Sequence, residues 1–132
     1  LLNKADFIKF NEDEIVEISS ELGHFKKDIK SCILFISEFS KTKSICVTKG
    51  GKGAVLFYEN KFYNQNGFKV NVEDTVGSGD SFLAMLINEL LNKKEPQESL
   101  KFACAIGAMV ATKSGANPEF SRSKIKDFIE SY

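Results

Sequence analysis

The stretch DTVGSGDSF, residues 74–82, decides how this chain is interpreted. It predicts a polar loop with two glycines that runs into a helix over residues 80–91. The first backbone N–H groups of a helix have no intrahelical partner, and together with the helix dipole they form a site suited to a phosphate. Gly77 and Gly79 permit positive φ and let the backbone approach a ligand closely. We therefore expect Asp80 to stand beside a bound anion, where it could accept a proton from an attacking hydroxyl.

Taken alone, the loop allows other interpretations. A serine or aspartate at the start of a helix is in most cases only a helix cap. The stretch is not a Walker loop, because no Gly-Lys-Ser/Thr closes it. It is not a complete dinucleotide fingerprint either, because Phe82 occupies the place of the third glycine. A dinucleotide-dependent oxidoreductase is therefore disfavoured.

Predicted strands and helices alternate around this loop. Extended segments are expected at residues 6–10, 44–48, 54–58, 61–63 and 68–72, and helices at 11–22, 28–39, 80–91, 96–113 and 123–132, with Gly115 after the fourth helix. Strands that alternate with helices indicate an α/β layered sheet, and the segments around Glu59 and Asn60 indicate an antiparallel hairpin. We expect one domain over residues 1–132, with a mostly parallel sheet and flanking helices.

Composition excludes several classes of protein. The chain has 132 residues, 42% of them hydrophobic, and a formal net charge of +0, so no sustained basic face suits a nucleic acid or a membrane surface. No apolar run is long enough to span a bilayer, and the first residues lack the pattern of a signal peptide. We expect a cytoplasmic protein whose partners include neither nucleic acid nor membrane.

The cysteines and the single histidine indicate no further chemistry. Cys32, Cys46 and Cys104 lie in apolar stretches without a CxxC or Cys–His spacing, which favours buried reduced thiols over a disulfide framework or a zinc site. His24 lies in a polar turn, so a Ser–His–Asp mechanism is disfavoured.

The quoted stretch resembles the C-terminal signature of the ribokinase and phosphofructokinase-B (pfkB) family of carbohydrate kinases, D-T-x-G-x-G-D-x-F. The resemblance covers essentially all 132 residues, but only the later part of the family's chain. It implies a ribokinase-like, Rossmann-like sandwich and the nucleotide-binding, catalytic part of an ATP-dependent sugar kinase. The wording of the motifs is most similar to fructokinases. A ribose, nucleoside or vitamin kinase and a non-catalytic nucleotide-binding module stay open as alternatives.

The resemblance also implies roles for individual residues. Asp80 would be the catalytic base, and the N–H groups of Gly77, Ser78, Gly79 and Asp80 would stabilise charge on the γ-phosphate. Asn11 and Glu14 in KFNEDE resemble the family's Asn-x-x-Glu element of the magnesium–phosphate network, although the same pair has the spacing of a capping box. Both roles stay open for that pair.

Two further segments resemble the walls of the family's nucleotide site. VTKGGKGA, residues 47–54, would line the nucleotide, and residues 102–118 would flank the adenine and then turn near a monovalent cation. Many members carry Asn or His where this chain has Cys104, so a polar contact to the base is in doubt there. The implied nucleotide residues are Thr48, Gly50, Gly53, Ala103, Cys104 and Gly107, and the implied K⁺ residues are Asp74, Val76 and Gly115. The expected ligands are ATP, Mg²⁺ (with Glu14 acting indirectly), K⁺ and a sugar, and a homodimer is the assembly we allow for.

Overall fold

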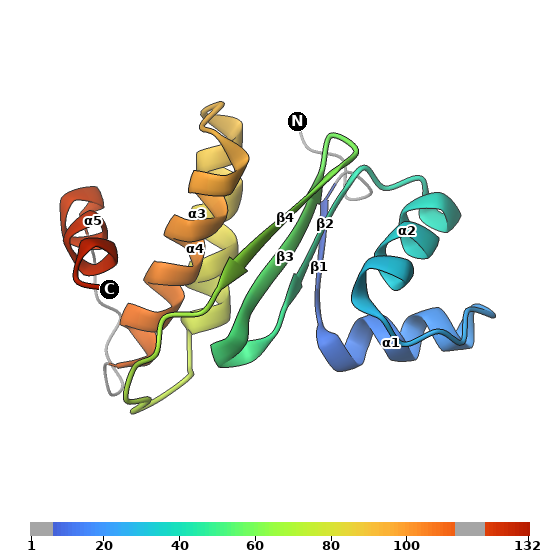
Figure 1. Cartoon of the computed structure of the whole chain (residues 1–132), viewed down its shortest axis with the longest axis horizontal. Helices are drawn as coiled ribbons and strands as arrows, with labels where there is room; N and C mark the ends of the chain where they lie inside the picture. Colours follow the sequence, from blue (N-terminus) through green and yellow to red (C-terminus); the bar gives the residue numbers. More distant parts are fainter. Residues whose placement is uncertain (1–6, 113–120) are drawn as a thin grey trace. The chain divides into compact units, whose positions relative to one another are not determined.

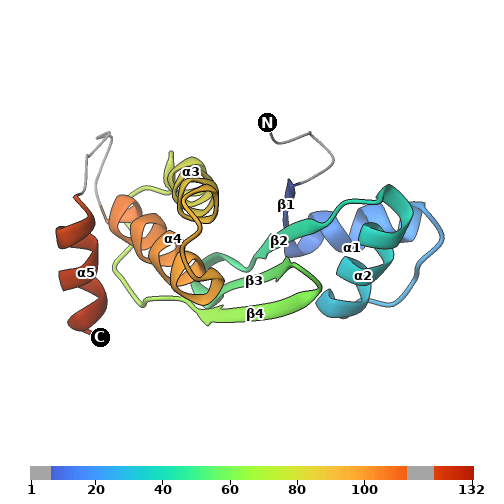
Figure 2. The same ribbon diagram turned by 90° about the horizontal axis from the view of Figure 1, so that it is seen from above.

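The structure is a computed structural model that describes residues 7–112 and 121–132 (Figures 1 and 2). Its elements are, in chain order, β1 (Phe7–Asn11), α1 (Glu12–Glu21), α2 (Ile29–Ser40), β2 (Ser44–Thr48), the 3₁₀ turn η2 (Gly50–Lys52), β3 (Gly53–Tyr58), β4 (Lys61–Asn66), α3 (Ser78–Leu91), α4 (Pro96–Ala111) and α5 (Arg122–Glu130). Strands and helices alternate as expected, which confirms the α/β class.

The described residues divide into two compact units. We call residues 7–50 and 54–64 the sheet unit, and residues 51–53, 65–112 and 121–132 the helical unit. Two compact units can belong to one domain, so the single domain expected from the sequence remains a prediction.

The sheet has four strands in the order β1-β2-β3-β4. β1 and β2 are parallel, with Phe7 opposite Ser44, because α1 and α2 provide a long crossover between them. β2 and β3 are antiparallel, with Val47 opposite Val55, because the short turn η2 cannot carry the chain back across the sheet. The sheet of this chain is therefore mixed, which corrects the expectation of mostly parallel pairing.

One face of the sheet forms the core of the sheet unit with α1 and α2. Side chains in β2 and β3 that point to this face alternate with side chains that point away from it, as a period of two requires. The buried members of the cluster are Phe10, Ile15, Cys32, Ile33, Ile36, Ile45, Val47, Val55 and Phe57. Each helix is capped at its start: Asn11 caps α1, and the Asp28 carboxylate accepts a hydrogen bond from the Ser31 N–H at 3.0 Å.

Most element boundaries agree with the sequence to within one or two residues. β4 continues to Asn66, three residues beyond its predicted end, whereas residues 68–72 form no strand. Gly67 follows β4 and passes so close to η2 that a Cβ on it would lie 2.0 Å from the Gly51 carbonyl oxygen. The chain then packs the Phe68 ring against aromatic rings in the C-terminal residues, and it does not extend the sheet.

The helical unit is built on the long contact between α3 and α4, against which α5 packs. Its core cluster consists of Phe102, Ala105, Met109 and Ile125, with Phe68, Met85, Ile106, Phe128 and Ile129 packed around them. The Glu89 carboxylate of α3 is buried and paired with the Arg122 guanidinium, which also lies 4.2 Å from the centroid of the Phe102 ring. α5 is thereby attached to both α3 and α4.

The cysteines are buried, and none of the three forms a disulfide, as expected. Within residues 7–112 and 121–132, no helix has the length and apolar character that crossing a bilayer requires.

Candidate functional site

The glycine loop of the helical unit, the polar loop that runs into α3, is anchored where it begins. The N–H groups of Glu73 and Asp74 both donate to the Ala111 carbonyl at the end of α4, at 2.8 and 3.2 Å. One Asp74 carboxylate oxygen then accepts from the Val76 N–H at 2.9 Å, which shapes the loop as an Asx turn. The loop thus leaves the end of α4 in a defined conformation before it reaches α3.

The chain reverses at Gly77, which has φ +83° and precedes the first residue of α3. The helix therefore begins at Ser78, two residues earlier than predicted, and Asp80 is its third residue. Gly79 lies inside the helix and has no positive φ, so it does not use the conformational freedom that the sequence allowed it. The physical reason is that Gly77 alone makes the left-handed turn.

The first turn of α3 presents unused backbone donors. The first intrahelical bond runs from the Ser81 N–H to the Gly77 carbonyl at 2.9 Å. The Ser78 N–H already donates to the Thr75 carbonyl at 3.1 Å, and the Ser78 hydroxyl donates to the same oxygen at 2.8 Å. Among the described residues, the N–H groups of Gly79 and Asp80 have no such partner. These two donors and the helix dipole suit an anion.

The Asp80 carboxylate is exposed in this first turn. An acidic side chain at this place stabilises a helix through the dipole by roughly 0.3–1 kcal/mol, so a purely structural role is open to it. It forms no ion pair within the described part of the chain, and it is therefore available to accept a proton from a bound ligand.

Gly107 brings α4 against this first turn. A Cβ on Gly107 would lie 3.5 Å from the Ser78 carbonyl oxygen and 3.7 Å from the Phe82 Cβ, which is ordinary van der Waals contact. Ala103 and Cys104 are buried in the same helix. Packing accounts for all three residues, and their contact with a nucleotide stays a prediction.

Gly53 has a structural reason of its own. It has φ +112°, and a Cβ there would lie 1.9 Å from the Gln65 carbonyl oxygen. The backbone around Gly53 thus crosses the chain at the end of β4, where Gly67 makes an equally close approach to Gly51. Sequence reasoning did not single out Gly67, and the only signal for it was a glycine after the second strand of the hairpin.

The sheet unit holds the other predicted residues. Asn11 and Glu14 form the capping box: the Glu14 N–H donates to Asn11 Oδ1 and the Asn11 N–H donates to Glu14 Oε1, both at 2.8 Å. The Thr48 hydroxyl makes a long bond to the Phe10 carbonyl at 3.4 Å, and Gly50 has φ +58°. The interpretation of Asn11 and Glu14 as a capping box is confirmed. Gly115 of the predicted K⁺ site lies outside the described residues.

No metal cage is built into the described residues. Within residues 7–112 and 121–132, no three His, Cys, Asp or Glu side chains come together in a way that could hold a metal ion. Mg²⁺ in phosphoryl-transfer sites keeps several waters and is bound through one or two carboxylates and the substrate phosphates. A magnesium ion at such a site needs no cage of protein side chains.

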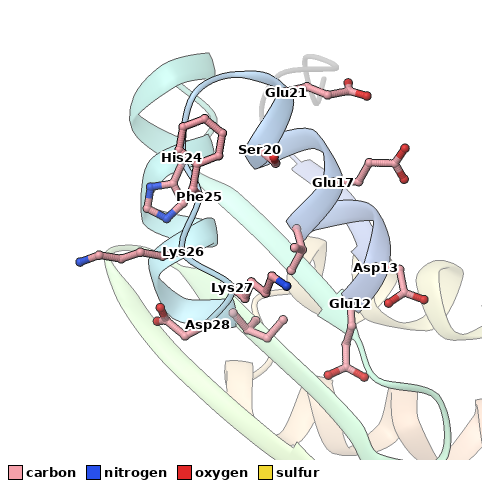
Figure 3. Close-up of a pocket in the computed structure, with 12 residues that line it drawn as sticks. Glu12, Asp13, Glu17, Ser20, Glu21, His24, Phe25, Lys26, Lys27 and Asp28 are labelled. Carbon is pink, nitrogen blue, oxygen red and sulfur yellow. The ribbon is translucent and has the colours of Figure 1, made fainter.

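A groove of about 710 Å³ lies in the sheet unit between α1 and the segment that leads to α2 (Figure 3). Acidic side chains of α1 line one side of it, and residues 24–28 line the other. None of the predicted site residues lines this groove. His24 stacks on Phe35 with ring centroids 4.8 Å apart, and its Nε2 lies 2.8 Å from the Ser31 hydroxyl. The Asp28 carboxylate accepts a hydrogen bond from the Ser31 backbone N–H.

Comparison with known proteins finds a matching family and similar curated proteins. A family model described as pfkB family carbohydrate kinase matches residues 1–122. Fructokinase-2 of Zea mays is 34% identical over 122 residues, which cover 87% of this chain and 35% of that protein.

Solved structures agree on the fold. A ribokinase of Thermotoga maritima is 29% identical, with a TM-score of 0.79 over 95% of this chain and 42% of that chain. A putative ribokinase II of E. coli is 24% identical, with a TM-score of 0.82 over 96% of this chain and 40% of that chain. The ribokinase-like fold is thereby confirmed. The chain spans about a third of the length of the curated relatives that it matches first.

Proposed function

This chain belongs to the pfkB family of carbohydrate kinases, and from that premise we propose that the protein containing it transfers the γ-phosphoryl group of ATP to a hydroxymethyl group of a sugar. The observation that carries the proposal is the start of α3. There the N–H groups of Gly79 and Asp80 have no partner among the described residues, and the Asp80 carboxylate is exposed. The likeness to a fructokinase of Zea mays supports fructose as the acceptor.

In the proposed reaction, the Asp80 carboxylate takes the proton of the sugar hydroxyl as its oxygen attacks the γ-phosphorus. The bond between the γ-phosphorus and the β–γ bridging oxygen breaks, and ADP leaves with the electron pair. The N–H groups of Gly79 and Asp80, with Gly77 at the turn, stabilise the negative charge on the transferred group. The Ser78 N–H would have to leave the Thr75 carbonyl to join them.

The nucleotide would contact the residues that the family resemblance assigns to it, which are Thr48, Gly50, Gly53, Ala103, Cys104 and Gly107. Mg²⁺ would neutralise phosphate charge when bound, and Glu14 has one carboxylate oxygen outside the capping box that could hold one of its waters. The putative ribokinase II of E. coli was solved in complex with ATP and Mg²⁺, which supports these ligands for this chain. K⁺ near Asp74 and Val76, a homodimer and a cytoplasmic location are further parts of the proposal.

A second acceptor has support of its own. The ribokinase of Thermotoga maritima is 29% identical to this chain, which favours ribose as an alternative to fructose. A panel of fructose, ribose, a nucleoside and a vitamin substrate, assayed with the complete protein by coupled ADP release, separates these possibilities. Release of ADP with none of them would leave a nucleotide-binding module as the function.

The base assignment is tested with Asp80→Asn in the complete protein. We expect kcat to fall about 100-fold or more, the scale on which a positioned base contributes, while ATP affinity changes little because the backbone donors remain. Asp13→Asn is a matched control, because Asp13 is also an exposed aspartate in the first turn of a helix, α1. Turnover near wild type in Asp80→Asn would show that another group takes the proton.

A further inference from the structure

The segment that leads into the glycine loop has few contacts of its own. Residues 67–72, which we call the stem, form neither helix nor strand. Among the described residues, one hydrogen bond reaches the main chain of the stem before the Glu73 N–H. That bond comes from the Tyr132 hydroxyl to the Lys69 carbonyl. The donor lies two residues beyond α5, 63 positions away along the chain.

Aromatic rings also contact the stem. The Phe68 ring meets the rings of Phe128 and Tyr132 edge to face, with centroids 5.4 and 5.3 Å apart. Phe128 and Tyr132 also contact each other at 5.0 Å. Edge-to-face pairs of this kind stabilise their arrangement beyond simple burial. We call these three rings and the bond to the Lys69 carbonyl the stem clamp.

The clamp is attached to the body of the helical unit. Ile125 of α5 is fully buried against α4, and Arg122 is paired with Glu89 of α3. Figure 1 draws α5 in red beside α4. An open hollow of about 580 Å³ lies beside the stem, lined by Val70 and Asn71 and also by Phe128 and Tyr132 of the clamp. The stem would therefore have room to move if the clamp were removed.

We propose that Phe128 and Tyr132 are positioning residues for phosphoryl transfer: they hold the stem, and through it the start of α3, in the conformation that the reaction needs. The proposal rests on the proposed function. The stem reaches Asp74, whose N–H and carboxylate shape the glycine loop, within five residues of Lys69. A displacement of about 1 Å at a reacting group can lower the rate about 100-fold, so a loose stem reaches the chemistry without touching a substrate.

The test uses the complete protein and two changes at Tyr132. Tyr132→Phe removes the hydroxyl and keeps the ring, so we expect kcat to fall about twofold to tenfold, the factor that one neutral hydrogen bond is worth. Tyr132→Leu removes the ring as well, and we expect a fall of roughly tenfold to 100-fold. The KM for the sugar stays near wild type in both, because neither contacts the acceptor. The ring retained in Tyr132→Phe should thus restore most of the turnover that Tyr132→Leu loses.

Ile125→Val is the matched control for stability. It removes one methyl group from the packing of α5 on α4 and leaves the three rings and the Tyr132 hydroxyl of the stem clamp in place, and all variants are assayed well below their melting temperatures. Backbone hydrogen exchange at Glu73 and Asp74 gives a second readout that needs no activity, because both N–H groups are bonded in the structure. We expect faster exchange there in Tyr132→Leu and unchanged exchange in Ile125→Val.

The outcomes separate this proposal from the proposed function. If wild type phosphorylates a sugar and both Tyr132 variants keep its kcat, the clamp does not position the loop. The same conclusion follows if kcat falls equally in Ile125→Val. If wild type phosphorylates no sugar, the proposed function fails, and the exchange data alone decide whether Tyr132 holds the stem. Unchanged exchange in Tyr132→Leu overturns the clamp whatever the activity.

Discussion

Gly53 has φ +112°, and a Cβ on it would stand 1.9 Å from the Gln65 carbonyl oxygen. We expect Gly53→Ala to lower the free energy of unfolding by about 2–4 kcal/mol, because left-handed strain adds to the displacement of a neighbouring backbone. Gly51→Ala is the matched change two residues away: a Cβ there meets nothing within 4 Å and the φ is not positive. It should change the free energy of unfolding by no more than about 0.5 kcal/mol.

Urea unfolding of the two variants beside wild type measures this difference. Equal free energies of unfolding for Gly53→Ala and Gly51→Ala would contradict the close crossing of the backbone at Gly53. The measurement also bears on the proposed nucleotide wall. A stable Gly53→Ala protein with weaker ATP binding would assign Gly53 to the ligand and not to the fold.

At the scale of an element, the start of α1 combines a structural role with a proposed functional one. Asn11→Ala removes one half of the capping box and should lower the free energy of unfolding by about 1 kcal/mol. Glu14→Gln keeps an oxygen that can accept from the Asn11 N–H, so stability should change little. It also removes the negative charge, so under the proposed function more Mg²⁺ is needed for half-maximal turnover.

A magnesium titration of turnover, with thermal unfolding as the parallel measurement, separates these roles. Turnover that is identical to wild type at every Mg²⁺ concentration in Glu14→Gln would leave the pair as a helix cap only. A melting temperature that falls as far in Glu14→Gln as in Asn11→Ala would mean that the charge itself stabilises α1.

At the scale of the whole molecule, the 132 residues match about a third of their first curated relatives. We expect the chain by itself to bind ATP or ADP weakly and to phosphorylate almost no sugar. Holding an acceptor in line with the γ-phosphate is worth roughly 7–11 kcal/mol of a barrier in favourable cases, and we expect the residues that hold the sugar to lie in sequence outside this chain. Calorimetry with ATP and a coupled assay with fructose and ribose check both halves. Turnover within about tenfold of the complete protein would place the sugar site inside these residues.

Much of the site could be predicted because it is local. The capping box joins residues three positions apart, and the loop, the turn and the helix of residues 74–91 follow one another directly. Their spacing alone determines which groups meet. Even here the prediction had an error that one residue explains: α3 begins at Ser78, so Gly77 takes the left-handed conformation and Gly79 does not.

By itself the sequence determined the order and type of the elements, the glycine loop before Asp80 and the family to which they are similar, because each depends on neighbours a few residues apart. The tertiary structure decided the rest. It paired β1 with β2, brought Gly53 against Gln65, and joined Tyr132 to the Lys69 carbonyl. Contacts of this kind link residues that are distant in the chain, so no local pattern encodes them. They exist only once the packing of buried side chains has set where each element lies within its unit.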